Sequence, residues 1–337
     1  MFNLNRLTVC EYIWIGGRGE IRSKTRVISR DINSFQYDNI PNWNYDGSST
    51  FQASSDRNTE IILKPCSYFK DPLRSIDNCD CILVLCDTYD INDNPLPTNH
   101  RYNAIKLFDK KLEESPWFGL EQEYFLVNNQ DDNSTISHEG MHYCRSANSL
   151  ERQIVEKHLK DCLTTGLYIY GINAEVASHQ WEFQIGPCTG VHASDHLVIA
   201  RYLLEKIAES FGVYVSYFPK PSPNINGSGC HINFSTESTR NPDGIKVIES
   251  CMSKLEKRHK EHINVYGEHN HIRLTGKHET SDINNFSYGI GTRNTSVRIP
   301  TQTIKDMCGY FEDRRPASNI DPYQATSIIF ETCCLEY

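Results

Sequence analysis

Two carboxylates lie two positions apart in the segment WFGLEQEYFLV, residues 117–127. Because side chains alternate between the two faces of a strand, Glu121 and Glu123 would share one face with Gly119. The opposite face would be apolar and would carry Phe118, Leu120, Tyr124 and Leu126. The chain therefore directs two acidic groups the same way out of a strand whose other side suits a hydrophobic core.

Other strand-like segments carry polar groups of the same kinds. These are Glu182 and Gln184 in NAEVASHQWEFQIGP, with Glu175 just upstream; His231, Asn233 and Ser235 in GCHINFS; Ser296 and Arg298 in TSVRIP; and Glu312, Asp313, Arg314 and Arg315 in GYFEDRRP. One interpretation is that they form the solvent faces of half-exposed strands. Such faces usually contain lysine, which is almost absent here, and a surface that collects this many carboxylates repels itself without cations. Carboxylate oxygens with one histidine suit Mg²⁺ or Mn²⁺, and the arginines suit an anionic ligand such as a polyphosphate.

A long polar loop, RLTGKHETSDINNFSYGIGTR, runs from Arg273 to Arg293 and has Glu279 near its middle. It has two interpretations, which the local sequence leaves open. It is an ordinary surface loop, or it is a lid that brings one carboxylate over an active site.

The elements that must position these residues form two regions. About ninety N-terminal residues read as strands and turns, namely VCEYIWI, TEIILKP and CDCILVLCDTY, and the Asp-, Asn- and Pro-rich segment DINDNPLPTNHR follows as a boundary. Beyond it we predict helices over residues 148–166, capped by Asn148 and Glu151, over residues 194–212, capped by Ser194 or Asp195, and over residues 243–267. The second region is thus α+β, with helices backing a largely antiparallel sheet.

Composition excludes several classes of protein. The 337 residues carry a net charge of −9, which lacks the basic excess of a nucleic-acid binder. The sequence has neither an apolar run of the ~20 residues that a membrane span needs nor a signal or transit peptide, so we expect a cytoplasmic protein. Its thirteen cysteines show no paired CxxC pattern and are expected to be reduced packing residues.

Seven motifs in order resemble glutamine synthetase of the eukaryotic type, from about Tyr12 to about Thr332. They are NWNYDGSSTFQ, WFGLEQEYFL, NAEV with QWEFQIGP, NGSGCHINFST, RLTGKHETS, TSVRIP and GYFEDRRPASNIDPY. The resemblance implies an N-terminal β-grasp domain, residues 1–94, and a C-terminal catalytic domain with a curved antiparallel sheet, residues 95–337. It implies the reaction of ATP, L-glutamate and ammonia to ADP, phosphate and L-glutamine through γ-glutamyl phosphate.

The resemblance also implies which residues hold the metals and the substrates. One Mg²⁺ or Mn²⁺ ion would be held by Glu123, Glu175 and Glu182, and a second, at the γ-phosphate, by Glu121, His231 and Glu312. Arg298 and Arg314 would stabilise the transferring phosphoryl group. Glutamate would be bound by Asn226, Gly227, His231, Arg273 and Arg293, and ATP by Trp117, Pro187, Asn233, Ser235, Arg240 and Tyr310.

For the ammonia half of the reaction, the resemblance implies that Asp46 of a neighbouring subunit binds and deprotonates ammonium, and that Glu279 closes over the acyl phosphate. The active site would then lie between subunits of a pentameric ring. The polar segment VNNQDDNSTISHEGMHYCRSANS stands where the family has a longer loop between rings, so a decamer is only an expectation. Two other hypotheses are a non-catalytic structural or sensing relative and a γ-glutamyl ligase for another amine.

Overall fold

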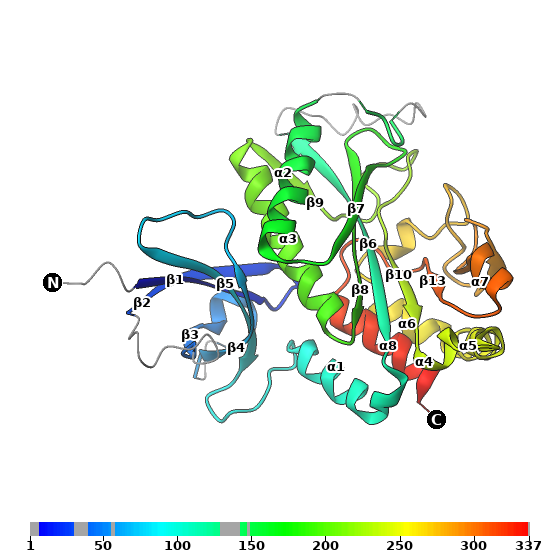
Figure 1. Cartoon of the computed structure of the whole chain (residues 1–337), viewed down its shortest axis with the longest axis horizontal. Helices are drawn as coiled ribbons and strands as arrows, with labels where there is room; N and C mark the ends of the chain where they lie inside the picture. The colour runs from blue at the N-terminus through cyan, green and yellow to red at the C-terminus, as the bar shows by residue number, and fades with distance from the viewer. Residues whose placement is uncertain (1–6, 30–39, 55–57, 129–141, 147–148, 336–337) are drawn as a thin grey trace. The chain divides into compact units, whose positions relative to one another are not determined.

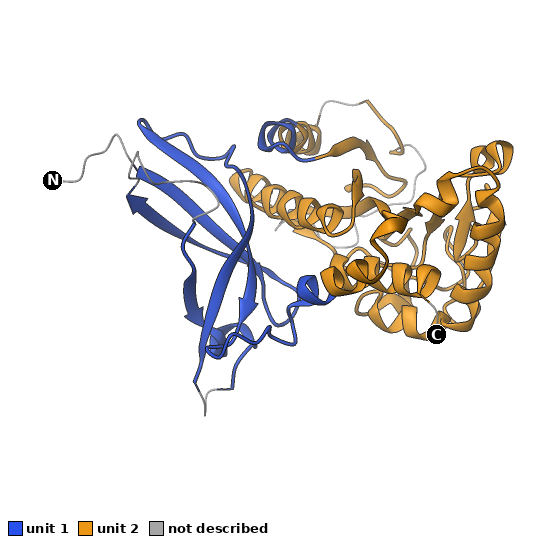
Figure 2. Ribbon diagram, turned by 60° about the horizontal axis from the view of Figure 1, so that its bottom comes forward, with its two compact units in different colours: residues 1–103, 160–167 blue, residues 104–159, 168–337 orange. Residues whose placement is uncertain are grey.

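The computed structural model describes residues 7–29, 40–54, 58–128, 142–146 and 149–335. The chain divides into two compact units, residues 1–103 with 160–167 and residues 104–159 with 168–337 (Figure 2). The predicted domain boundary after residue 94 stays a prediction.

The first unit is built on a five-stranded sheet with the strand order β2-β1-β5-β4-β3. Its strands are β1 (Leu7–Ile15), β2 (Ile21–Ser29), β3 (Trp43–Asp46), β4 (Glu60–Lys70) and β5 (Cys79–Tyr89). The central pair β1 and β5 is parallel and the other pairs are antiparallel, as the β-grasp arrangement requires. Alternate residues of β1, Cys10, Tyr12 and Trp14, enter a hydrophobic core with Leu63 and Val84. The predicted sheet domain is therefore present.

The second unit contains an eight-stranded sheet with the order β11-β12-β13-β10-β6-β8-β7, and β9 pairs with β6 (Figure 1). Only the β11–β12 pair is parallel among these strands of the described chain. The strands are β6 (Trp117–Asn128), β7 (Ile169–Ala174), β8 (Gln180–Thr189), β9 (Val213–Ser216), β10 (Cys230–Ser235), β11 (Tyr288–Ile290), β12 (Val297–Ile299) and β13 (Phe311–Asp313).

Helices pack on the apolar face of this sheet, as predicted. Helix α3 contacts β6, β8, β9 and α8, and α8 also contacts α5 and α6. The α-helices of the described chain are α1 (His100–Phe108), α2 (Leu150–Thr165), α3 (His192–Ser210), α4 (Glu237–Arg240), α5 (Gly244–Lys257), α6 (His259–Val265), α7 (Thr301–Asp306) and α8 (Pro322–Cys334). None of the described helices is long and apolar enough to cross a membrane.

Two details of the predicted helices are wrong. Helix α3 begins at His192, before the predicted capping residues, because Asp195 accepts a hydrogen bond from the Tyr323 hydroxyl at 2.7 Å and Ser194 lies 3.3 Å from Thr326 Oγ1. The predicted third helix is two helices, α5 and α6, which are separated at Arg258 (φ −100°, ψ 15°). For the first helix, the predicted cap Asn148 lies outside the described residues, and Glu151 pairs with His179 instead.

A buried polar contact connects the central strand to the helical layer. Gln122 lies between Glu121 and Glu123 in sequence, but its side chain is fully buried on the opposite face of β6. Its amide nitrogen donates to Ser318 O at 3.0 Å, and its amide oxygen accepts from Arg201 Nε of α3 at 2.8 Å. Arg201 also donates to the Ile320 and Ser318 carbonyl oxygens, each at 2.9 Å. Because these buried polar groups satisfy one another, they fix β6 in place beneath the two carboxylates.

Candidate metal and nucleotide site

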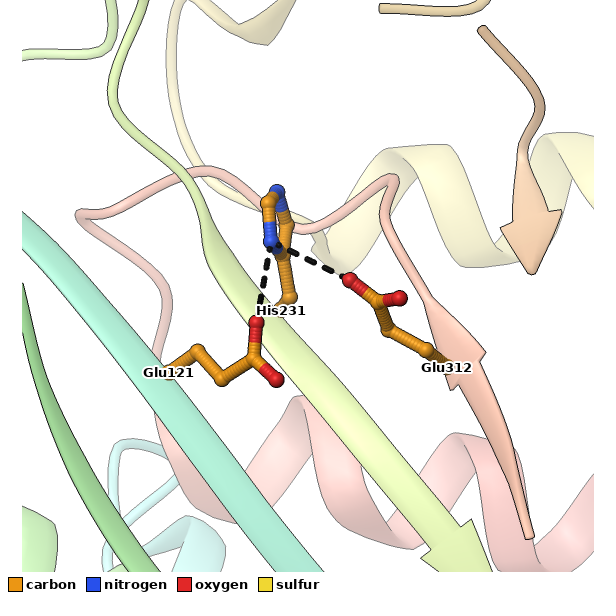
Figure 3. Close-up of side chains that lie close together, drawn as sticks. All are labelled: Glu121, His231 and Glu312. Carbon is orange, nitrogen blue, oxygen red and sulfur yellow. Dashed lines mark ion pairs between the residues drawn. The ribbon is translucent and has the colours of Figure 1, made fainter. Parts of the chain in front are cut away.

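Three strands bring one histidine and two glutamates together. His231 of β10 is paired in register with Glu121 of β6, and β10 also pairs with β13, which carries Glu312. His231 Nδ1 lies 3.4 Å from Glu121 Oε2 and 3.4 Å from Glu312 Oε1 (Figure 3). One ligand atom from each residue lies within 4.8 Å of the other two. This trio is the one that the resemblance assigns to the metal at the γ-phosphate.

The electrostatics of the trio suit a hard divalent cation. Burial, with the nearby Arg314 guanidinium, holds the pKa of His231 well below its ordinary value, so the imidazole is neutral and can offer a lone pair. Glu312 is fully buried and Glu121 is partly exposed. Two carboxylate oxygens with one imidazole nitrogen form a donor set that divalent cations use in proteins. The residues present therefore fit a metal ion.

The second predicted trio, Glu123, Glu175 and Glu182, is less closely gathered. Glu123 and Glu182 are directly opposite each other on β6 and β8, but within the described residues no second group meets the 4.8 Å spacing of the first. Burial and the charge of Glu175 raise the pKa of Glu123 to about 8. Burial raises the pKa of Glu175 to about 7, and burial with the charges of Glu121 and Glu123 raises that of Glu182 well above its ordinary value. These carboxylates lack enough positive charge nearby to ionise together.

Strand β13 and the two residues after it alternate between the site, which Glu312 and Arg314 face, and the core, which Asp313 and Arg315 enter. Arg314 Nη1 donates to Glu312 Oε1 at 2.7 Å, and Arg298 of β12 pairs with Glu312 Oε2. Asp313 and Arg315 are fully buried and form an ion pair of 2.6 Å on the other side. The two predicted phosphate-binding arginines therefore both adjoin the histidine trio.

A pocket of 770 Å³ extends from these carboxylates to a group of aromatic rings. Glu121 and Glu182 line its acidic end. All six residues predicted to contact ATP line the same pocket, namely Trp117, Pro187, Asn233, Ser235, Arg240 and Tyr310. The Arg240 guanidinium lies 4.2 Å from the centre of the Trp117 ring and donates to Ser235 Oγ at 3.1 Å. The volume falls in the range typical of small-molecule sites, about 300–1,000 Å³.

The loop that carries Glu279 reaches toward predicted glutamate-binding residues. Glu279 has a backbone φ of +64°, and its Oε1 atom pairs with Arg293 Nη1 at 3.1 Å. Asn226 Nδ2 donates to Glu279 Oε2 at 3.5 Å. Glu279 also raises the pKa of Glu175, after the larger effect of burial, so the loop carboxylate lies near a predicted metal ligand.

The predicted substrate residues Gly227 and Arg273 lie against each other. A Cβ atom on Gly227 would lie 2.6 Å from Pro219 O and 2.8 Å from Arg273 Cγ, so no side chain fits there. Arg273 is buried, and its Nη2 atom lies 3.0 Å from His231 Nε2. The same guanidinium donates to the Arg314 and Arg315 carbonyl oxygens at 3.1 and 3.2 Å. In this structure Arg273 therefore holds the segment that carries Glu312 and Arg314.

Comparison with known proteins agrees with this geometry. A family model described as "Glutamine synthetase, catalytic domain" matches residues 101–244. The chain is 51% identical to a "Putative glutamine synthetase" of Acanthamoeba polyphaga mimivirus over 97% of this chain and 94% of that protein. It is 48% identical to the glutamine synthetase of Saccharomyces cerevisiae, over 97% of this chain and 89% of that protein. The chain belongs to the glutamine synthetase family. A cytosolic glutamine synthetase isozyme of Arabidopsis thaliana, 49% identical over 97% of this chain, is a further relative.

Membership in the glutamine synthetase family confirms the resemblance and the fold class predicted from the motifs. The predicted ammonium residue, Asp46, lies in the first unit at the end of β3. Its carboxylate is exposed and accepts hydrogen bonds from Ser48 N at 2.9 Å and Ser48 Oγ at 2.6 Å, which lower its pKa. The Ser48 contacts keep the carboxylate ionised and fix its direction.

The sequence reasoning missed one residue of this glutamine synthetase site. Gln180 is 1% exposed, and its amide nitrogen lies 3.3 Å from Glu123 Oε2, which also accepts a hydrogen bond of 2.7 Å from Gly229 N. Both donors act on one oxygen, so Glu123 Oε1 stays available on the side of His231 Nε2, 3.8 Å away. A polar residue two positions before Glu182 on β8 was a signal that could have indicated this role.

Proposed function

We propose that this protein ligates ammonia to the γ-carboxylate of L-glutamate with the hydrolysis of ATP to ADP and phosphate, through γ-glutamyl phosphate. The observation that carries the proposal is the pocket that joins Glu121 and Glu182 to Trp117 and Tyr310. A nucleoside triphosphate needs both ends, because its phosphates require cations and its base requires apolar surface. Close relatives named glutamine synthetase support the same reaction.

The first half of the proposed reaction is phosphorylation of the glutamate side chain. Glu121, His231 and Glu312 would hold one Mg²⁺ or Mn²⁺ ion, and Glu123, Glu175 and Glu182 a second. Bound ions of this kind offset the charge of the triphosphate and align the in-line transfer. Arg298 and Arg314, which now pair with Glu312, would turn their remaining donors to the transferring phosphoryl group. Asn226, Gly227, Arg273 and Arg293 would bind glutamate.

The second half needs ammonia in place of ammonium. We propose that Asp46 from a neighbouring subunit takes the proton of ammonium, and that Glu279 excludes water from the acyl phosphate. The active form would then be a pentameric ring or a pair of rings, located in the cytoplasm.

An activity assay of oligomers mixed from two variants tests whether each active site is shared between two subunits. Asp46→Ala and Glu279→Ala are each expected to be inactive, and subunits mixed from both are expected to regain activity, since some sites would contain both native residues. Failure to regain activity in mixed oligomers would contradict a shared site.

The proposed reaction is tested by γ-glutamyl hydroxamate formation from glutamate, ATP and hydroxylamine with Mg²⁺ or Mn²⁺. A folded, oligomeric preparation should form the hydroxamate, and Glu312→Gln should not. No product from the native protein would leave a structural or sensing relative as the better account.

Competition between ammonium and larger primary amines identifies the acceptor. Ammonium should be the preferred substrate, because Asp46 and Glu279 suit a small cationic precursor.

A further inference from the structure

Tyr170 is the most exposed large hydrophobic side chain of the described residues, with 81% of its surface exposed, and it lines the 770 Å³ pocket. It lies on β7, at the edge of the sheet beside β8. None of the metal, phosphate or glutamate roles above uses it. Aromatic side chains that line a pocket are typical contacts of a bound ligand.

A β-bulge places the Tyr170 ring there. Ile169 pairs with Ile185 on β8, whereas Gly171 pairs with the next residue, Gln184, so Tyr170 is an extra residue without a partner in the ladder. A Cβ atom on Gly171 would lie 2.7 Å from Gln184 Oε1, so Gly171 faces the polar side, where Gln184 lines the pocket. Tyr170 thus lines the pocket although its neighbour Gly171 already faces the polar side, which regular alternation forbids. Bulges next to active sites commonly redirect a side chain in this way.

Two more aromatic rings line the same pocket. Tyr310, just before β13, is 43% exposed and Trp117, at the start of β6, is 41% exposed. Arg240 covers one face of Trp117, so that ring has one face left for a ligand. The Tyr170 hydroxyl is close enough to Tyr310 to contribute to its raised pKa, after the larger effects of burial and of Glu121 and Glu312. The pocket is therefore lined by aromatic rings from β7, from β6 and from the segment before β13.

We infer that Tyr170 is a base-binding residue of the nucleotide pocket, which holds the purine of ATP from the β7 side opposite Tyr310. Its ring supplies contact area to the base and makes no contact with the phosphates, which belong at the acidic end with Glu121 and Glu182. The inference rests on the proposed use of ATP. It names Tyr170 as a residue by which this protein distinguishes a nucleotide from a polyphosphate without a base.

Calorimetric titration of the full-length protein with two ligands, Mg²⁺–ATP and Mg²⁺–tripolyphosphate, tests this role. In Tyr170→Ala the Kd for ATP should rise about tenfold, the factor that corresponds to ~1.4 kcal/mol of lost stacking, while the Kd for tripolyphosphate stays unchanged. Tyr170→Phe should retain ATP affinity, because the ring and not the hydroxyl makes the contact. Tyr214→Ala, which removes a half-exposed tyrosine of β9 outside the pocket lining, is the matched control and should bind both ligands normally.

The outcomes separate the inference from the proposed function. If the native protein and Tyr170→Ala bind ATP equally, the role of Tyr170 is wrong while the use of ATP stands. An equal loss for ATP and tripolyphosphate would also overturn it, because a general distortion of the pocket would then be responsible. If the native protein binds tripolyphosphate and ATP with the same affinity, the pocket does not recognise a base and the inference fails. If it binds neither, the proposed function itself fails.

Discussion

His231 of β10 lies directly across from Glu121 of β6, and its Nδ1 atom is 3.4 Å from Glu121 Oε2. On the other side of β10, Asn233 is paired in register with Glu312. The trio is therefore set by hydrogen-bonded ladders between three neighbouring strands, which fix ligand positions better than loops do. Glu123, two residues beyond Glu121, faces Glu182 of β8 instead. The two-residue spacing of Glu121 and Glu123 thus directs them to different partners.

The trio should bind a divalent cation through Glu312. We expect Glu312→Gln to weaken Mn²⁺ binding at least about tenfold, because it removes a charged ligand that is fully buried beside His231. Electron paramagnetic resonance of free Mn²⁺ measures the change. Glu237→Gln, on the exposed surface of α4, serves as the control. Equal Mn²⁺ binding by native protein and Glu312→Gln would exclude this trio as a metal site.

Metal-free protein should lose stability as the pH rises from about 4.5 to about 8. The folded pKa values of Glu123, about 8, and Glu175, about 7, exceed the ordinary value of 4.5, so the folded state binds more protons than the unfolded chain in this range. The free energy of unfolding then falls with pH, and the loss is complete above the folded pKa values. Thermal unfolding with chelator at several pH values measures it.

The same protons must leave when a metal binds, since the ligands are ionised in the bound form. Mg²⁺ should therefore raise the melting temperature more at pH 8 than at pH 6. Calorimetry in buffers with different ionisation enthalpies should show proton release. A metal-free protein whose stability rises across this range would contradict the assignment of raised pKa values to these buried carboxylates.

The strands and their faces could be predicted from sequence because burial on one side enforces a period of two. In β8, Trp181 and Phe183 are buried in the core, and Glu182 faces the other carboxylates, as expected. The segments that failed are those where tertiary contacts override the local pattern. Ser194 and Asp195 resemble a helix cap, yet contacts with α8 hold them inside the first turn of α3.

The local sequence also could not predict which polar side chains are buried in the core, or where a strand contains an extra residue. Gln122 can be buried because two distant groups satisfy its amide, Arg201, 79 positions away, and the Ser318 carbonyl oxygen. Tyr170 lines the pocket only because of a shift in pairing between β7 and β8. Neither the long-range contacts of Gln122 nor the register shift at Tyr170 can be recognised in the sequence around these residues. The closeness of His231, Glu121 and Glu312 likewise depends on the order of strands β13, β10 and β6 in the sheet. The sequence implied that these three residues come together only through the family resemblance.

Glu279→Ala should retain ATP binding and lose biosynthetic turnover by about 100-fold or more, the scale of one general acid–base group. The side chain contacts Arg293 and Asn226 and lines none of the nucleotide pocket, so nucleotide affinity has no reason to change. Steady-state phosphate release with ammonium, together with ATP titration, separates the two effects. Glu249→Ala, exposed on α5, is the control. An unchanged turnover would remove the loop carboxylate from the mechanism.

Asp313→Asn should destabilise the protein by about 3 kcal/mol, because it leaves the buried Arg315 guanidinium without its counter-charge. Asp313 also accepts a hydrogen bond of 2.7 Å from the Tyr266 hydroxyl. Urea unfolding measures the free energy. Glu261→Gln, which breaks the exposed pair with Arg258, should lower the free energy of unfolding far less, because water screens that pair. Equal effects of the two substitutions would show that the buried pair contributes no more than a surface pair.

The central claim is that this chain makes glutamine through an acyl phosphate, and transfer of oxygen from glutamate to phosphate tests it most directly. L-Glutamate labelled with ¹⁸O in the γ-carboxylate is supplied with ATP, ammonium and Mg²⁺, and the phosphate is analysed by mass spectrometry. We predict one ¹⁸O atom in each phosphate released and one glutamine formed per phosphate. Phosphate without the label, or phosphate release that is independent of glutamate, would contradict the account.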